Sequence, residues 1–178
     1  MYPVLRMAWQ LFRHRNAPPL AVTGCHVSRH MCLPWDIDLW MELNNGRTLT
    51  LYDLGRIPLA WRTGLVGILK KHRWGLTMAG ASVRYRRRIR MFESVEMRSR
   101  LVCWDEKFMY IEQSMWKADG ECANHILYRA AVTGRAGIVP PAELADALGQ
   151  PRISPEIPAW VAAWIEADSA RPWPPMQE

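Results

Sequence analysis

Residues 36–47 read DIDLWMELNNGR, and this stretch decides the fold. Three acidic residues precede Asn44, Asn45 and Gly46, and beyond them the apolar spacing becomes helical. Asparagine is a favoured N-cap residue, so we expect a helix to begin at Asn44 or Asn45. The unpaired N–H groups of its first turn can hold an oxygen atom that carries negative charge.

This helix is expected to be long. Apolar residues recur at helical spacing as far as Pro58, where we expect an interruption because proline cannot donate its backbone hydrogen bond. A second helical piece, residues 59–72, ends in Lys70, Lys71 and His72, which are cations that suit a helix C-terminus.

The chain beyond Gly75 has the alternation of an antiparallel sheet. In residues 94–104, Val95, Met97, Leu101 and Cys103 are expected to share the dry face. Residues 20–30 form an earlier predicted strand, and Asp119-Gly120 predicts a tight hairpin in which both residues take positive φ. A strand, a long helix and a meander of strands predict an α+β fold, in which an antiparallel sheet of five or six strands wraps around the central helix.

The two ends of the chain are expected to be accessories. We predict an N-terminal helix in residues 1–17, the main domain in residues 18–150, and a C-terminal helix and tail in residues 151–178. Helices starting near Pro140 and at residues 157–167 should pack outside the sheet. No apolar run at the start could span a bilayer, and no cleavage site marks a usual signal peptide.

The N-terminal helix is expected to be amphipathic. Its apolar side either packs on the domain, which we favour, or lies on a membrane surface. That side comprises Val4, Leu5, Ala8, Leu11 and Phe12, with Arg6, Arg13 and Arg15 around the other side.

Composition indicates an ordinary globular domain with a preference for anions. The 178 residues are 49% hydrophobic and 22% charged, with a net charge of +6 carried mostly by arginine. Arginine binds phosphate through paired hydrogen bonds, and no nucleic-acid motif is present, so nucleic acid is not the expected partner. The four cysteines lack metal-ligand spacing, so we expect four buried thiols, no metal and a cytoplasmic or membrane-peripheral location.

Residues 36–47 resemble the hotdog thioesterases related to 4-hydroxybenzoyl-CoA thioesterase, which typically show D-x-D-x-x-x-H-x-N-N before a helix. The likeness continues at Asp53 and Arg56, at AGASVRY in residues 79–85 and at VPPAEL in residues 139–144. It implies a hotdog fold in a homodimer, or a tetramer, that hydrolyses an acyl-CoA or acyl-carrier thioester. Coenzyme A would be part of the substrate, and no separate cofactor is expected.

The resemblance also implies a catalytic set. Asp38 would act as general base or nucleophile, and the sequence leaves both roles open. Backbone N–H groups of Asn45 and Gly46, after Asn44, would hold the thioester oxygen as it gains charge. Asp36 and Asp38 equally fit the role of turn or capping residues.

Two residues depart from the family pattern. Glu42 stands where histidine is common, and Thr48 stands where tyrosine is common. Glutamate can accept a proton as histidine can, or it can be a solvent-facing anion at the helix start. A non-catalytic protein that binds acyl-CoA or an acyl carrier is therefore the alternative.

The remaining predicted contacts concern substrate binding. Arg84, Arg86, Arg88 and Arg90 alternate along one predicted strand, so we expect them to share one face, with Arg87 opposite. They would bind coenzyme A phosphates or form a solvated face with Glu93 and Glu96. Trp40 and Trp61 are either packing anchors or the lining of an acyl tunnel. The full predicted substrate-binding set is Asp36, Trp40, Thr48, Arg84, Arg86 and Arg88.

Overall fold

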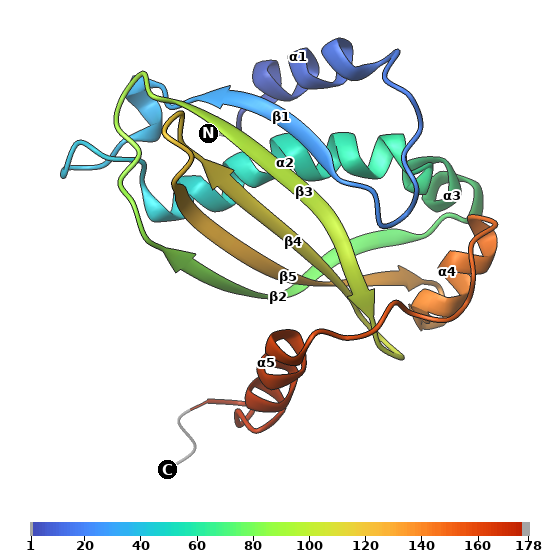
Figure 1. Cartoon of the computed structure of the whole chain (residues 1–178). Helices are drawn as coiled ribbons and strands as arrows, with labels where there is room; N and C mark the ends of the chain where they lie inside the picture. Colours follow the sequence, from blue (N-terminus) through green and yellow to red (C-terminus); the bar gives the residue numbers. More distant parts are fainter. Residues whose placement is uncertain (1, 176–178) are drawn as a thin grey trace.

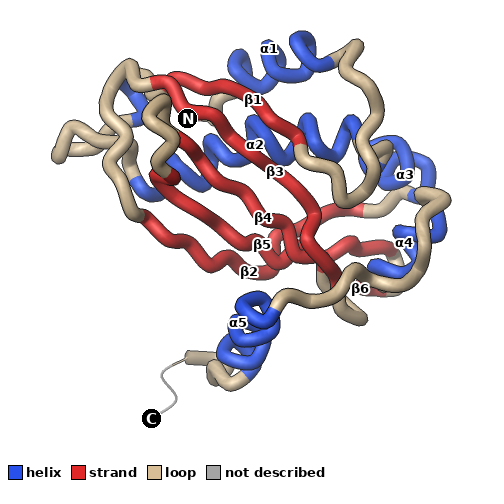
Figure 2. The backbone as a smooth tube through the Cα atoms, viewed as in Figure 1, coloured by secondary structure: helices blue, strands red, loops and turns tan. Residues whose placement is uncertain are grey.

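An antiparallel sheet curves around one long helix, α2 (Asn45–Arg62), as predicted (Figure 1). The computed structural model describes residues 2–175, so residue 1 and residues 176–178, which end the predicted terminal segments, lie outside it. The sheet is formed by β1 (His26–Met31), β2 (Gly75–Tyr85), β3 (Ser94–Trp104), β4 (Met109–Trp116), β5 (Cys122–Gly134) and β6 (Gly137–Val139). The order in space is β1-β3-β4-β5-β2, and β6 pairs with the end of β5 (Figure 2).

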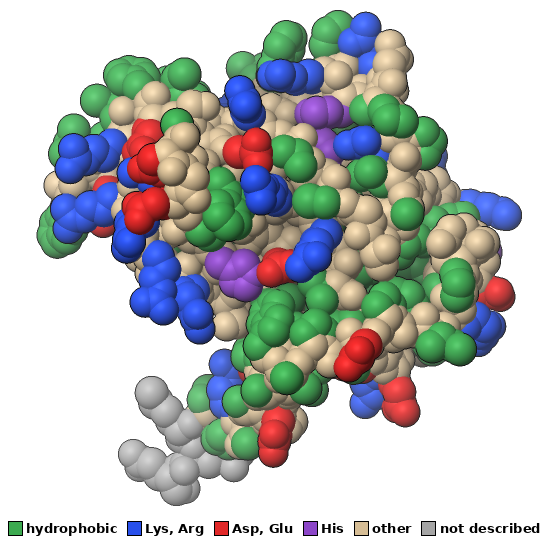
Figure 3. Space-filling model, viewed as in Figure 1, with side chains coloured by type: hydrophobic (Ala, Val, Ile, Leu, Met, Phe, Trp, Pro, Cys, Tyr) green, Lys and Arg blue, Asp and Glu red, His purple; other side chains and the backbone are tan. Residues whose placement is uncertain are grey.

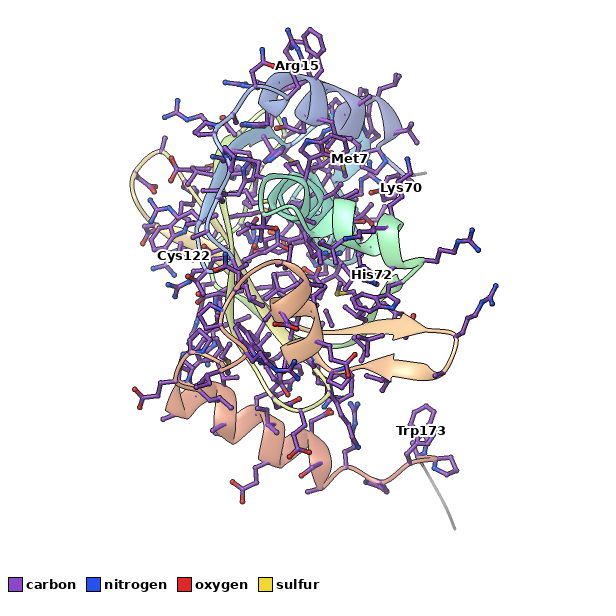
Figure 4. All side chains as sticks on the ribbon, turned by 90° about the vertical axis from the view of Figure 1, so that its right-hand side faces the viewer. Met7, Arg15, Lys70, His72, Cys122 and Trp173 are labelled. Carbon is purple, nitrogen blue, oxygen red and sulfur yellow. The ribbon has the colours of Figure 1, made fainter. Side chains whose placement is uncertain are left out.

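The other helices cover both faces of the sheet. They are α1 (Val4–His14), the short 3-10 helix η1 (Pro34–Asp36), α3 (Leu65–His72), α4 (Pro141–Ala147) and α5 (Ala159–Ser169). Helix α1 lies beside α2 on the same side of the sheet (Figures 1 and 4). Helix α5 packs on the opposite face, where Val161 contacts a small apolar cluster of Cys103, Tyr110 and Leu127.

Helix α2 continues through Pro58, so the predicted interruption there is wrong. Proline removes one backbone donor, and the buried Leu54 and Leu59 on either side keep this part of the helix packed on the sheet. The chain instead breaks at Gly64, whose φ of +78° suits glycine, and α3 follows.

Gly55 sets how closely α2 approaches the sheet. A β-carbon at this position would lie 2.6 Å from both Met97 Sδ and Ser99 Oγ on β3. The amide of Gln113 on β4 donates to the Tyr52 carbonyl (2.9 Å) and to Ser99 Oγ (2.7 Å). The helix backbone is therefore hydrogen-bonded directly to the sheet, at a distance that only glycine permits.

A β-bulge in β3 corrects the predicted dry face. The register between β3 and β4 shifts between Leu101 and Cys103. Val95, Met97 and Leu101 face the α2 side as predicted, but Cys103 joins the cluster beneath α5. The extra residue reverses the alternation, because side chains of a strand change face at each position.

Three smaller predictions also need correction. The first strand begins at His26 instead of residue 20 and ends at Met31, one residue beyond the predicted end. In the hairpin that follows β4, only Gly120 takes a positive φ (+86°), and Asp119 does not. All four thiols are free, but Cys25 is exposed and Cys122 is partly exposed, so only Cys32 and Cys103 are buried as predicted.

Helix α1 packs on the domain, but not through its predicted apolar side. Its buried residues are Met7 and Gln10, and Figure 4 shows Met7 between α1 and α2, whereas Arg15 lies on the outer side. Leu11 packs partly against the core, but Val4, Leu5, Ala8 and Phe12 are exposed. Among the described residues, no helix combines the length and hydropathy needed to cross a membrane.

Candidate active site

The predicted acids lie on a tight hairpin just before α2. Ile37 bridges to Leu43, and the Asp38 N–H donates to the Glu42 carbonyl (2.9 Å). Residues directly opposite each other in an antiparallel pair project from the same face. The carboxylates of Asp38 and Glu42 therefore share one face of the hairpin, while the buried Leu43 lies on the core side.

Asp38 also has the turn role that the sequence left open. Its Oδ1 accepts a hydrogen bond from the Trp40 N–H (2.8 Å), which stabilises the reversal at the hairpin tip. Met41 completes the reversal with a φ of +59°. The tip exposes Leu39, Trp40 and Met41, so within one chain Trp40 lines no acyl tunnel, and the exposed Trp61 does not either.

The start of α2 is an open site for a negatively charged oxygen. Asn44 is the N-cap and its side chain accepts from the Arg47 N–H (3.0 Å). The N–H groups of Asn45 and Gly46 precede the first intrahelical hydrogen bond, and both residues are exposed. Both N–H groups therefore lie at the surface and lack an intrahelical acceptor.

A hollow of about 160 Å³ opens on one side of the α2 N-terminus. We call it the Glu42 hollow; its lining includes Glu42, Asn45, Thr48, Tyr85, Arg86 and Asn124. The Tyr85 hydroxyl donates to the Asn45 carbonyl (3.1 Å), and Thr48 is buried with its hydroxyl donating to the Asn44 carbonyl (3.1 Å). Tyr85 and Asn124 were not predicted, because only the pairing of β2 with β5 brings them to α2.

A second hollow of about 440 Å³ lies on the other side of the helix start. We call it the Gly46 hollow; it is lined in part by Tyr2, Trp35, Asn44, Gly46 and Thr50. Asp38 lines neither of these two hollows. Within a single chain, Glu42 therefore borders the Glu42 hollow, and Asp36 borders the Gly46 hollow.

Asp36 has a structural position. It is fully buried, and it accepts hydrogen bonds from Arg6 Nη1 (2.6 Å), Arg47 Nε (2.7 Å) and the Leu33 N–H (3.0 Å). Burial alone would raise the pKa of this carboxyl, but the hydrogen bonds from Arg47, Leu33 and Arg6 together hold it below its ordinary value. Because Asp36 joins α1 to the start of α2, we leave it out of the substrate-binding set.

The predicted arginine ladder is wrong beyond Arg84. Strand β2 ends at Tyr85, because the N–H groups of Arg86 and Arg87 both donate to the Ala123 carbonyl and the chain bends. Arg87 then pairs with Glu121 (2.8 Å), and Arg88 pairs with Glu42 (2.8 Å). The arginines therefore do not share one strand face.

Three arginines, Arg86, Arg87 and Arg88, line the Glu42 hollow. Within the described residues, the guanidinium groups of Arg84, Arg86 and Arg90 have no carboxylate partner, although the Arg90 N–H donates to Glu93 Oε2 (2.9 Å). Lys and Arg side chains are visible at the left edge of the molecule, where the hairpin and the loop after β2 lie (Figure 3). This edge can therefore hold an anionic group of a ligand.

Two further features are the lack of a metal-ligand cluster in the described residues and a small apolar cavity under α2. Across residues 2–175, no three His, Cys, Asp or Glu side chains lie close enough together to hold a metal ion. A narrow apolar cavity of about 50 Å³ lies under the C-terminal half of α2, with Leu59, Trp104 and Leu144 in its walls and Arg56 among the residues that border it.

Comparison with known proteins identifies the family. The model of the thioesterase-like superfamily matches residues 32–165, and the chain belongs to this superfamily. Protein THEM6 of Xenopus laevis is 32% identical over 143 residues, which cover 79% of this chain and 67% of that protein. The chain spans 53–67% of the length of the curated THEM6 relatives that it matches.

Solved structures confirm the hotdog fold. The probable thioesterase YbaW of Escherichia coli aligns with a TM-score of 0.65 at 15% identity, over 69% of this chain and 96% of that chain. A hypothetical protein of Staphylococcus aureus, solved in complex with CoA, aligns with a TM-score of 0.58 at 11% identity. That alignment covers 82% of this chain and 84% of the other.

Proposed function

We propose that this protein hydrolyses an acyl-CoA or acyl-carrier thioester at the N-terminus of α2. The observation that supports this most is the position of Asp38 opposite Glu42, on the hairpin that leads into the unpaired N–H groups of Asn45 and Gly46. These N–H groups would stabilise the carbonyl oxygen as it gains charge.

Asp38 is the proposed general base or nucleophile. As a base it would take a proton from the water whose oxygen attacks the carbonyl carbon. The carbon–sulfur bond of the resulting intermediate then breaks, and the leaving thiolate takes up a proton. As a nucleophile its carboxylate would attack the carbonyl carbon and displace the thiolate, which takes up a proton; water then hydrolyses the acyl anhydride to the free acid and restores Asp38. Glu42, directly across the hairpin, would be the second acid–base group.

Arg84 and Arg86 are the proposed contacts for the phosphates of coenzyme A. Both are exposed, and neither has a carboxylate partner in the described chain. Arg88 is already paired with Glu42, so it would contribute less to phosphate binding.

We propose that a homodimer completes the site. Strand β2 pairs with β5 along one edge, and none of its residues is buried, so its other edge is open to a second copy. The strand ends at Tyr85 in the wall of the Glu42 hollow, so a partner at this edge would cover the hollow. Light scattering should give a mass of at least twice the 20.6 kDa chain; a monomer at assay concentration would contradict this.

The activity is tested with purified protein and acyl-CoAs from two to eighteen carbons, together with one aromatic acyl-CoA and the matching acyl-carrier thioesters. We expect release of free thiol from at least one substrate, measured with a thiol reagent. A chain that releases no thiol from any member, although it is folded by circular dichroism, would contradict the proposal.

The second candidate is a non-catalytic protein that binds acyl thioesters. The ion pair between Glu42 and Arg88 favours it, because a paired carboxylate replaces the histidine that is common at this position. It predicts binding of acyl-CoA by calorimetry without turnover, and a gain of thiol release in Glu42→His. Turnover by the unmodified chain excludes it.

A further inference from the structure

The outer face of α1 is apolar and exposed. The side chains of Val4, Leu5, Trp9 and Phe12 are 64%, 86%, 57% and 54% exposed, and we call this surface the outer strip. The rings of Trp9 and Phe12 stack, with 6.0 Å between their centroids. Contiguous apolar surface of this kind marks a contact with a partner or a membrane more often than isolated apolar residues do.

The inner face of α1 is already engaged with the domain. Met7 and Gln10 are only 8% and 5% exposed, and Arg6 is held by the buried carboxylate of Asp36. The outer strip is therefore not the side by which α1 packs on its own domain. Packing on the domain and contact with a further surface use opposite sides of α1, so both can occur together.

The charged residues of the N-terminal segment that contains the strip are all basic. Residues 1–35 contain four arginines and no Asp or Glu. Arg13 and Arg15 are exposed at the C-terminal end of α1, and the Arg15 guanidinium lies 3.8 Å from the centre of the Phe12 ring. Within the described chain neither has a carboxylate partner. Figure 3 shows hydrophobic side chains and Lys or Arg side chains together along the upper edge, where α1 lies.

We propose that the outer strip binds a membrane surface that contains anionic lipids. Apolar side chains would enter the interface between headgroups and acyl chains, and Arg13 and Arg15 would contact lipid phosphates. A second copy of this chain is a poorer occupant, because strip-to-strip contact would bring the same two cations on each copy together.

This contact would place the α2 N-terminus near the lipid. Tyr2, just before α1, lines the Gly46 hollow together with Trp35. Arg6 of α1 also pairs with Asp36, whose carbonyl accepts from the Asn44 N–H (2.9 Å) at the start of α2. If the proposed function holds, a thioester with a membrane-embedded acyl chain would reach the site over a short path.

The test is cosedimentation of the full chain with vesicles. Vesicles of phosphatidylcholine with phosphatidylglycerol should bind the protein roughly tenfold more tightly than phosphatidylcholine alone, since each arginine near an anionic surface adds to binding. Raised salt should weaken this difference. No binding to the anionic vesicles at low salt would overturn the proposal.

Matched variants locate the contact. Leu5→Gln/Trp9→Gln/Phe12→Gln should lower vesicle binding at least tenfold, and Arg13→Gln/Arg15→Gln should remove the preference for anionic lipid. Ile153→Gln alters an apolar side chain that is 85% exposed elsewhere, and it should bind as the unmodified chain does. Circular dichroism checks that each variant is folded.

Two results would contradict membrane binding by the outer strip. Vesicle binding of the folded triple variant at the level of the unmodified chain would place the contact elsewhere. Light scattering that shows assembly lost in this variant, without any vesicle binding by the unmodified chain, would identify the strip as a contact between copies. Neither readout needs turnover, so failure of the thioesterase proposal is distinguishable.

Discussion

Asp36 and Arg47 form a buried ion pair, with 2.7 Å between Oδ1 and Nε, at the point where the hairpin meets α2. The other oxygen of Asp36 lies 2.6 Å from Arg6 Nη1 on α1. One carboxylate therefore holds the N-terminal helix, the hairpin and the central helix together.

Asp36→Asn should destabilise the fold by about 3 kcal/mol, because it leaves two arginines near a buried site without their shared anion. Denaturation by urea measures the change. Glu121→Gln, which breaks the exposed pair with Arg87, is the matched control and should cost less than about 1 kcal/mol. Equal losses in the two variants would contradict the structural role of Asp36.

Gly55→Ala should destabilise the protein by about 1–3 kcal/mol, although alanine favours helices, because the added carbon would lie 2.6 Å from Met97 Sδ and Ser99 Oγ. In α3, a β-carbon at Gly67 would meet nothing within 4 Å, so Gly67→Ala should stabilise by up to about 1 kcal/mol. Thermal melts of the two variants should shift in opposite directions.

The stability should fall as the pH drops below neutral. Burial lowers the pKa of His26 from 6.5 to about 4 and that of His30 to about 3, with smaller contributions from nearby positive groups. Between pH 6.5 and these values the unfolded chain binds protons that the folded chain does not. Each histidine then costs up to about 1.4 kcal/mol per pH unit.

Urea midpoints measured from pH 7 to pH 4.5 test this slope. His30→Gln should flatten it, because this buried histidine has the lower pKa of the two. A slope that His30→Gln does not alter would assign the acid sensitivity to other groups.

Arg86→Gln should raise the KM for acyl-CoA about tenfold, which is what one charge-assisted hydrogen bond to phosphate contributes. The KM for the corresponding acyl-pantetheine, which lacks the nucleotide phosphates, should not change. Arg152→Gln, at an arginine paired with Asp146 on α4, should affect neither substrate. A rise for both substrates would place Arg86 at the acyl end instead.

Local sequence patterns predicted the helix start and most of the strands. The errors occur where the backbone departs from regular helix or strand geometry. The N-cap at Asn44 and the strand alternation both follow from residues that are close in sequence. The bulge after Leu101 and the bend at Arg86 could not be predicted, because each depends on which carbonyl of a neighbouring strand accepts the hydrogen bond. Pro58 was misread because packing of α2 on the sheet outweighs one lost hydrogen bond.

The candidate site was predictable only in part. The motif placed Asp38, Glu42, Asn45 and Gly46 together because all four lie on one short segment. Tyr85 and Asn124 come from distant strands, so only the sheet register brings them to the Glu42 hollow. The contact of Asp36 with α1 was not predicted, because its partner Arg6 lies thirty positions away in the sequence.

The most direct test of the central claim is kcat/KM for thiol release by Asp38→Asn, on the best acyl-CoA from the panel. The account predicts a loss of at least about 100-fold, because a positioned base contributes roughly that much. Asp146→Asn, a matched change at an exposed carboxylate on α4, should keep full activity. Full activity in a folded Asp38→Asn variant would contradict the account.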